Sequence, residues 1–203
     1  SIAATHRDSG AVARVDQRIT VEAGPGSAWE GWLALQRDLE LPAGVAQARV
    51  VLRDAFLGRV GATTIRFEVP PAGGLRLATP VLTDRLRPRE RGVPPQPVLL
   101  ARREFAAGGR LYCHFQVLGM GTGAPEAGTI ESRFLLRHAG GSTVTEGKPG
   151  PLSVGADGRL IGLMGVPLEG LAAGPYELVL RVEDLANGRV LEQTETFQVG
   201  GGP

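Results

Sequence analysis

The sequence has one cysteine, one lysine and no run of 18 apolar residues. A single cysteine excludes an internal disulfide framework and leaves the redox compartment undecided. The lack of a long apolar run predicts that no helix of this chain spans a membrane. The net charge of +1 provides no field for recruiting nucleic acid or anionic lipid. The 21 arginines against one lysine are more typical of a GC-rich genome than of phosphate recognition.

The sequence also has neither a signal peptide nor an initiator methionine, so residues 1–5 are typical of the start of a mature or cleaved product. It does have 30 glycines and 15 prolines, and they are scattered rather than clustered. That distribution is typical of many short strands joined by turns. The length of 203 residues fits two domains of about 100 residues each, and the 42% hydrophobic content is enough for packed cores.

An internal repeat organises the chain. Residues 41–69 match residues 171–199 without a gap, and ten of the 29 paired positions are identical. The spacing of 130 residues is far too long for a solenoid, so the repeat predicts two copies of one domain type. The shared residues include the glycine pair Gly44 and Gly174 and the aspartate pair Asp54 and Asp184.

Each copy of the repeat is predicted to be a β-hairpin. Leu178, Leu180 and Val182 alternate with mostly polar residues, which is the period of a strand with one buried face. Gly188 and its counterpart Gly58 supply the positive φ of a tight turn. Asp54 and Asp184 stand where an aspartate accepts hydrogen bonds from the turn's own backbone, and we assign both a structural role.

The segment before the second hairpin resembles the tyrosine corner of immunoglobulin-like sandwiches, in which a tyrosine hydroxyl binds nearby backbone. Tyr176 would take that role, with Gly174 before it. A half-buried tyrosine next to an ordinary turn is the alternative. The first copy has Ala46 at this place, so its corner must be secured differently.

The pattern along the chain predicts an all-β protein of two tandem immunoglobulin-like β-sandwich domains. The first covers residues 1–70, a proline and glycine linker covers 71–74, and the second covers 75–200. We expect further strands in the first domain over residues 11–22 and 29–41, a helix being the rival for the latter. The first domain is then one or two strands short of about seven. Residues missing before Ser1 or another polypeptide would complete its open edge.

No catalytic, metal or cofactor site is predicted. Cys113 and His114 are adjacent on a predicted strand, so their side chains point to opposite faces and cannot act together. Cys113 is interpreted as a buried small apolar residue. His6, His114 and His138 lack the spacing of a metal motif. The chain is therefore expected not to be an enzyme.

Two groups of residues are candidates for contact with a partner. Trp29 and Trp32 flank a glycine and could form a contact patch for protein or carbohydrate, or could cap the end of a sandwich. A basic, proline-rich loop over residues 85–97 could bind an acidic surface or could be an irregular solvated connection. The arginines of this loop are Arg85, Arg87, Arg89 and Arg91.

The pattern Leu-Pro-x-Gly-x-x-x-x-Arg-Val-x-x-Arg-Asp-x-x-x-Gly-Arg-Val-Gly-x-x-x-x-x-Phe-x-Val-Pro over residues 41–70 resembles a known family. The resemblance is to the C-terminal region of secreted von Willebrand factor A-related proteins of Acidobacteria and similar bacteria. In that family an A domain precedes β-sandwich modules that end in this hairpin. The A domain is absent from this sequence, so its metal site does not carry over. The resemblance implies an extracytoplasmic, non-catalytic sandwich region.

The sequence as a whole predicts a structural or protein-interaction module outside the cytoplasm, periplasmic or secreted. The partners expected are other proteins, in the form of a larger envelope or membrane assembly on which the chain docks as an accessory subunit. No cofactor and no nucleic acid are expected. The alternative function is a carbohydrate-binding module, which would need Trp29, Trp32 or Tyr112 to form an exposed flat platform.

Overall fold

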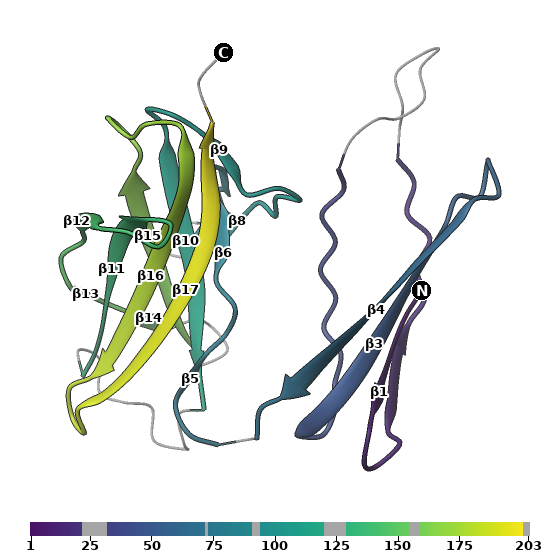
Figure 1. Cartoon of the computed structure of the whole chain (residues 1–203). Helices are drawn as coiled ribbons and strands as arrows, with labels where there is room; N and C mark the ends of the chain where they lie inside the picture. Colours follow the sequence, from purple (N-terminus) through teal and green to yellow (C-terminus); the bar gives the residue numbers. More distant parts are fainter. Residues whose placement is uncertain (22–31, 72, 91–93, 120–128, 155–158, 201–203) are drawn as a thin grey trace. The chain divides into compact units, whose positions relative to one another are not determined.

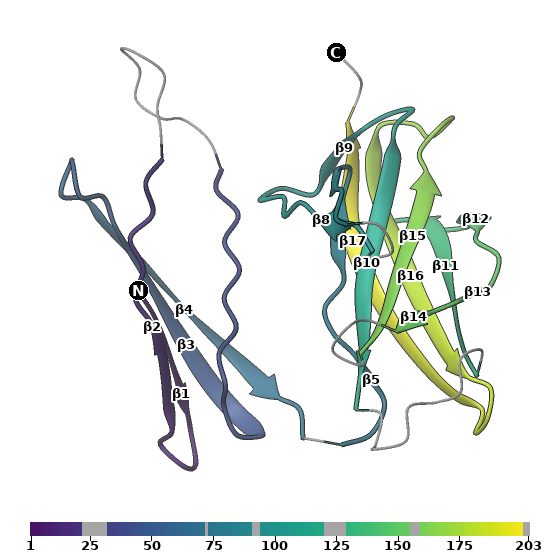
Figure 2. The ribbon, with the colours of Figure 1, turned by 180° about the vertical axis from the view of Figure 1, so that it is seen from behind.

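The chain is an all-β protein that divides into two compact units, Ser1–Ala72 (unit 1) and Gly73–Pro203 (unit 2). Figures 1 and 2 show the ribbon of a computed structural model from two sides. The residues that the structure describes are 1–21, 32–71, 73–90, 94–119, 129–154 and 159–200. No helix occurs among them, and none is therefore long and apolar enough to cross a membrane. The predicted all-β class is confirmed. The division falls inside the proline and glycine segment 71–74.

Unit 1 is built on one antiparallel sheet of four strands (Figure 1). The strands are β1 (Ile2–His6), β2 (Val12–Val15), β3 (Gly44–Arg53) and β4 (Val60–Val69), and their order in the sheet is β2-β1-β3-β4. A tight turn at Gly10, with φ of 67°, joins the first two strands. Gly58, with φ of 69°, closes the turn between β3 and β4 because the left-handed region favours glycine.

Unit 2 is a β-sandwich of two sheets with a common core. One sheet has the order β14-β15-β10-β5, with β6 also paired to β10, and the other has the order β12-β11-β16-β17-β9, with β13 also paired to β11. The strands are β5 (Arg76–Leu77), β6 (Val81–Thr83), β7 (Leu86–Arg87), β8 (Gln96–Pro97), β9 (Glu104–Ala106), β10 (Arg110–Leu118), β11 (Ile130–His138), β12 (Thr143–Glu146), β13 (Gly150–Pro151), β14 (Ser153–Val154), β15 (Leu160–Pro167), β16 (Gly174–Asp184) and β17 (Arg189–Gly200). The short strands β7 and β8 pair with each other.

The core of unit 2 lies between its two sheets. Leu111, Cys113, Phe115 and Val117 alternate along β10, and each is at most 1% exposed. The facing sheet contributes alternate residues of β16, from Tyr176 to Val182, together with Phe197 and Val199 of β17. Each strand therefore has the period-2 burial of a half-buried strand, as the sequence predicts.

The sheet of unit 1 repeats one sheet of unit 2 strand for strand. The β3–β4 hairpin and the β16–β17 hairpin have the same register: all ten residue pairs of the first recur in the second, 130 positions later. The five pairs between β1 and β3 likewise recur between β11 and β16, so that His6 opposite Ala46 corresponds to His138 opposite Tyr176. The order β2-β1-β3-β4 thus corresponds to β12-β11-β16-β17.

Two expectations for unit 1 are wrong. Residues 32–41, expected to form a strand, form none, and the strand expected over 11–22 is limited to Val12–Val15. The described residues of unit 1 contain a single sheet. In unit 2 the segment that precedes the second hairpin is the strand β15, and β10 pairs with it along its whole length. Unit 1 has no counterpart of β10 in its described part. The tandem immunoglobulin-like arrangement remains a prediction.

Candidate interaction surface

The sheet of unit 1 has one face composed almost entirely of apolar side chains. Residues directly opposite each other in an antiparallel pair share a face, and alternate residues along a strand return to it. Starting from Ala46, the pairing therefore assigns one set of residues to the same side of all four strands. We call this set the apolar face: Ala13, Val15, Ile2, Ala4, His6, Ala46, Ala48, Val50, Leu52, Thr63, Ile65, Phe67 and Val69.

Much of the apolar face is exposed, whereas the equivalent face in unit 2 is buried. Phe67 is 37% exposed and its counterpart Phe197 is 3% exposed. Leu52 is 59% exposed and its counterpart Val182 is completely buried. Ala4 and Ala46, at the other end of the face, are buried. The open part of the apolar face therefore lies on β4 and at the far end of β3.

Position 65 is the clearest difference between the two copies. Ile65 is 55% exposed, and the residue 130 positions later is Glu195, which is only 7% exposed. The Glu195 carboxylate accepts hydrogen bonds from the Arg103 guanidinium at 2.5 Å and from the Gln193 amide at 2.7 Å. The apolar Ile65 is thus exposed, whereas the charged Glu195 is buried. In the described part of the chain, only unit 2 has a second sheet over this face and an arginine, Arg103, that binds the carboxylate.

The outer edge of the hairpin also differs between the units. In unit 2, β9 pairs in parallel with the end of β17, and Gln198 N–H donates to Arg103 C=O at 2.8 Å. Phe105 of β9 is buried edge-to-face against Phe197, with ring centroids 5.7 Å apart. In the described part of unit 1, β4 is the last strand of its sheet and has no such neighbour. Its outer backbone groups form an open sheet edge.

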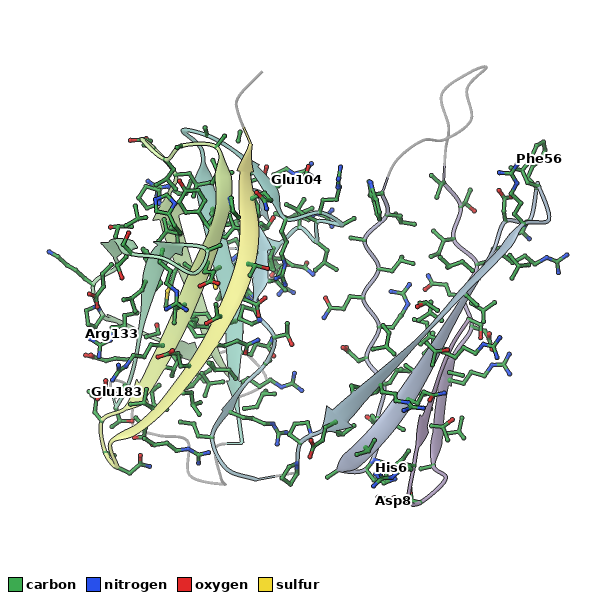
Figure 3. All side chains as sticks on the ribbon, in the orientation of Figure 1. His6, Asp8, Phe56, Glu104, Arg133 and Glu183 are labelled. Carbon is green, nitrogen blue, oxygen red and sulfur yellow. The ribbon has the colours of Figure 1, made fainter. Side chains whose placement is uncertain are left out.

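The tip of the unit 1 hairpin adds exposed apolar area to that edge. Figure 3 shows Phe56 at the turn between β3 and β4, where its side chain is 95% exposed. Leu57 beside it is 57% exposed, and Val60 at the start of β4 is 63% exposed. In unit 2 the two tip positions are occupied by Ala186 and Asn187. The β3–β4 hairpin of unit 1 thus exposes apolar side chains at its tip as well as on its face.

The aspartates predicted to support the turns do contact the turn backbone. The Asp54 carboxylate accepts hydrogen bonds from the N–H groups of Phe56 at 2.8 Å and Leu57 at 2.9 Å. These two hydrogen bonds hold the pKa of Asp54 below its usual value. Asp184 accepts a hydrogen bond from the Ala186 N–H at 3.0 Å and one from the Asn187 side-chain amide at 2.8 Å.

The tyrosine and glycines assigned structural roles lie at the ends of the second hairpin. The Tyr176 hydroxyl donates to the carbonyl of Ala172 at 3.0 Å, four residues upstream, which is the hydrogen bond of a tyrosine corner. Its ring stacks on Phe197, with centroids 5.9 Å apart. Gly174 has φ of 151° and Gly188 has φ of 69°. In unit 1, Ala46 stands at the position of Tyr176, and the nearby His6 Nε2 lies 2.9 Å from the Ala43 carbonyl oxygen.

The residues predicted to contact a partner are divided between the two units. Trp29 and Arg91 lie outside the described residues. Trp32 is 71% exposed at the start of the irregular segment 32–43 of unit 1. Arg85, Arg87 and Arg89 are exposed before, in and after β7 of unit 2. Arg85 forms a surface ion pair with Asp84 at 3.3 Å. Tyr112 is half-buried in unit 2.

No metal or nucleophile site is formed by the described histidines and cysteine. The Cys113 thiol is completely buried, and burial raises its pKa to about 12. His114 points to the other face of β10, where burial lowers its pKa. Among the described residues, no group of three or more His, Cys, Asp and Glu side chains is placed to hold a metal ion.

The charged residues on the outer face of the β11–β16 pair are neutralised by one another. Arg133 pairs with Glu183 at 3.2 Å, as Figure 3 shows, and Arg137 pairs with Glu177 at 2.7 Å. A shallow hollow beside them is lined by Glu131, Arg133, Arg181 and Glu183. Arg133 and Arg181 both pair with Glu183 on this surface, at 3.2 Å and 3.9 Å, which is a structural role of small energetic weight.

Comparisons with known proteins identify no family for this chain. No family model and no curated protein matches it, so the resemblance to von Willebrand factor A-related proteins remains a prediction. A solved structure similar to this chain is a copper-bound variant of FetP from uropathogenic Escherichia coli strain F11. The two chains are 13% identical, the match covers 64% of this chain and 87% of FetP, and the TM-score is 0.32.

The sequence predicts an incomplete first domain with an open edge, but it does not identify the residues of the apolar face. A signal for it exists in the repeat itself: Ile65 stands where the second copy has Glu195, and Phe56 and Leu57 stand where it has Ala186 and Asn187. An excess of apolar residues in one copy indicates a surface that something else covers. The sequence could not reveal that the described part of unit 1 has no second sheet, because residues 32–41 have strand-like alternation.

Proposed function

We propose that this chain is a non-catalytic structural module that binds another protein, and that unit 1 is its binding part. The observation that carries the proposal is the apolar face, which unit 1 exposes and unit 2 buries. Leu52, Ile65 and Phe67 are 59%, 55% and 37% exposed on adjacent strands. Exposed apolar residues on one face of a sheet, beside an open sheet edge, are typical of protein interaction sites.

The proposal includes the setting that the family resemblance implies: an accessory subunit outside the cytoplasm, docked on a larger envelope or membrane assembly. Its support is the resemblance of residues 41–70 alone. The partner identified by the experiment below decides it, because a partner resident in the cytoplasm would overturn this part.

The test uses a photo-reactive amino acid at two neighbouring positions of β4. Ile65 is on the apolar face, and Thr64 is exposed on the opposite face of the same strand. In the cells that produce the protein, we expect a discrete cross-linked product from position 65 and none from position 64. Mass spectrometry of the product identifies the partner.

Three outcomes would overturn the proposal. They are the absence of any product from position 65, equal products from both positions, and a product that consists of two copies of this chain. Equal products would indicate collision rather than docking on a face. A product of two copies would make the apolar face a homodimer contact.

The carbohydrate-binding alternative lacks a specific supporting observation. Its three aromatic residues are divided between a described residue of unit 1, Trp32, a residue outside the described part, Trp29, and Tyr112 of unit 2.

A further inference from the structure

Residues 32–37 of unit 1 lie at the sequence position that part of β15 has in unit 2, but the described part of unit 1 has no strand for that segment to pair with. Counting back from the shared glycine, Gly44 or Gly174, the position of β15 corresponds to residues 30–37. In unit 2, β10 pairs with β15 through eight successive residue pairs, from Arg110 with Pro167 to Val117 with Leu160. Figure 1 draws residues 32–43 of unit 1 as an extended, irregular trace beside the sheet. Leu33 and Leu35 on this trace are 46% and 44% exposed.

Unit 2 shows what fills the equivalent space. β10 lies in the sheet opposite β16 and β17 and presents Leu111, Cys113, Phe115 and Val117 to them. The same strand gives β15 its backbone hydrogen-bond partner. A strand at the position of β10 therefore covers the inner face of the facing sheet and also provides the backbone hydrogen-bond partner of the segment before the hairpin. The described part of unit 1 has neither this cover nor this partner.

We propose that the protein bound by unit 1 contributes an extended segment that takes the place of β10. This inference rests on the proposed function and names the chemistry of the partner. The segment has apolar side chains at alternate positions, which pack on Leu52, Ile65 and Phe67. Its backbone pairs with residues 32–37, as in β-strand addition to an open sheet.

A second copy of this chain is a poor source of that segment. Its own β10 is held by three strands at once: β15 on one side and β5 and β6 on the other. All its core-facing side chains are at most 1% exposed. Releasing β10 would expose the core of unit 2, so β10 of a second copy does not supply the strand. The donor that we propose is a different polypeptide whose strand is free to be inserted.

The test adds a synthetic peptide to the full chain. The peptide has the sequence of residues 110–118 with alanine in place of Cys113, and a control peptide also has serine in place of Leu111, Phe115 and Val117. Binding is followed by tryptophan fluorescence, since both tryptophans of the chain lie in unit 1. Amide hydrogen exchange then locates the site. We expect exchange in residues 32–37 to slow at least ~10-fold with the first peptide and to be unchanged with the control.

Matched variants separate the face from the backbone pairing. Ile65→Asp should abolish peptide binding, because it places a carboxylate on the apolar face, whereas Thr64→Asp on the opposite face should not. The Ala34→Pro and Leu35→Pro variants should differ from each other in peptide binding. Neighbouring residues of a strand direct their N–H groups to opposite sides, so only one of the two prolines removes a donor to the inserted strand. None of the four positions is buried, and an unchanged circular dichroism spectrum checks folding.

The results distinguish failure of this inference from failure of the proposed function. Absence of peptide binding, binding without slowed exchange in residues 32–37, or equal effects of the two proline variants would overturn strand insertion. If Ile65 still cross-links to a partner in cells, that partner covers the apolar face as a folded surface, and the proposed function stands. If neither experiment detects a contact at Ile65, both strand insertion and the proposed function are overturned.

Discussion

The two units contain the same four-stranded sheet in two different states. In unit 2, the sheet forms one layer of a sandwich and its inner face is buried. In unit 1, the sheet keeps the same strand order and register while Leu52, Ile65 and Phe67 stay exposed. The comparison separates two requirements of β structure. Register is set by the turns and by alternation along the strands, and burial of a face requires a second layer.

The largest difference in stability between variants of the two units is expected at the equivalent phenylalanines, Phe197 and Phe67. Phe197→Ala should destabilise unit 2 by about 3–5 kcal/mol, because the ring is 3% exposed and packs against Tyr176 and Phe105. Phe67→Ala, at a ring 37% exposed, should cost unit 1 only about 1 kcal/mol.

Each unit has its own intrinsic probe for this measurement. The single cysteine, Cys113, is buried in unit 2, so urea-dependent labelling of its thiol reports unfolding of that unit. Both tryptophans belong to unit 1, so their fluorescence reports unit 1. Equal losses of stability from Phe67→Ala and Phe197→Ala would contradict the conclusion that a second layer covers the sheet in unit 2 and not in the described part of unit 1. Addition of the residue 110–118 peptide should raise the cost of Phe67→Ala toward that of Phe197→Ala.

The next largest effect is expected at the charged contact that only unit 2 makes. Arg103→Ala should cost unit 2 about 2 kcal/mol, because it leaves the Glu195 carboxylate, 7% exposed, without its guanidinium partner. The Arg103 side chain is 38% exposed, so solvent reduces the loss below that of a fully buried pair. The double variant with Glu195→Ile, which copies position 65 of unit 1, should recover most of the stability. Cys113 labelling measures both, and no recovery would show that the ion pair is not the cause.

The predictability of the fold differs along the chain for a physical reason. The hairpins at 44–69 and 174–199 could be predicted because their information is local: alternating residues, an aspartate and a glycine at each turn. Residues 32–41 carry the same alternation and form no strand, because a strand also needs a partner that sequence alternation does not supply. An open first domain could be predicted from its missing strands, but the residues of the apolar face could not be named, for the same reason. Ile65 and Phe67 have the pattern of core residues, and only the arrangement of the described strands shows that no layer of unit 1 covers them.

A smaller effect is expected at the corner of the second hairpin. Tyr176→Phe removes the hydrogen bond from the hydroxyl to the Ala172 carbonyl and should cost unit 2 about 1 kcal/mol, since the ring stays packed on Phe197. Cys113 labelling in urea measures the loss. The matched control is Tyr112→Phe, at a half-buried tyrosine of β10 in the same unit, which should change stability by less. Equal losses in the two variants would contradict a special role of the corner.

The smallest effect is expected at the turn of unit 1 in acid. The N–H groups of Leu57 and Phe56 hold the pKa of Asp54 below its ordinary value of 3.8. A carboxyl whose pKa is lowered on folding supports the folded turn fully above that ordinary value, and the support is lost as the pH falls through the lowered pKa. In nuclear magnetic resonance spectra, the amide protons of Phe56 and Leu57 should therefore shift with a midpoint below 3.8.

The control for this titration is the amide side chain at the same position. Asp54→Asn should abolish the titration and keep the turn, because the asparagine oxygen can accept the same hydrogen bonds. Asp184→Asn, in the equivalent turn of unit 2, should leave the titration of Phe56 and Leu57 unchanged. A midpoint at or above 3.8, the ordinary value, would show that these two N–H groups do not stabilise the Asp54 carboxylate.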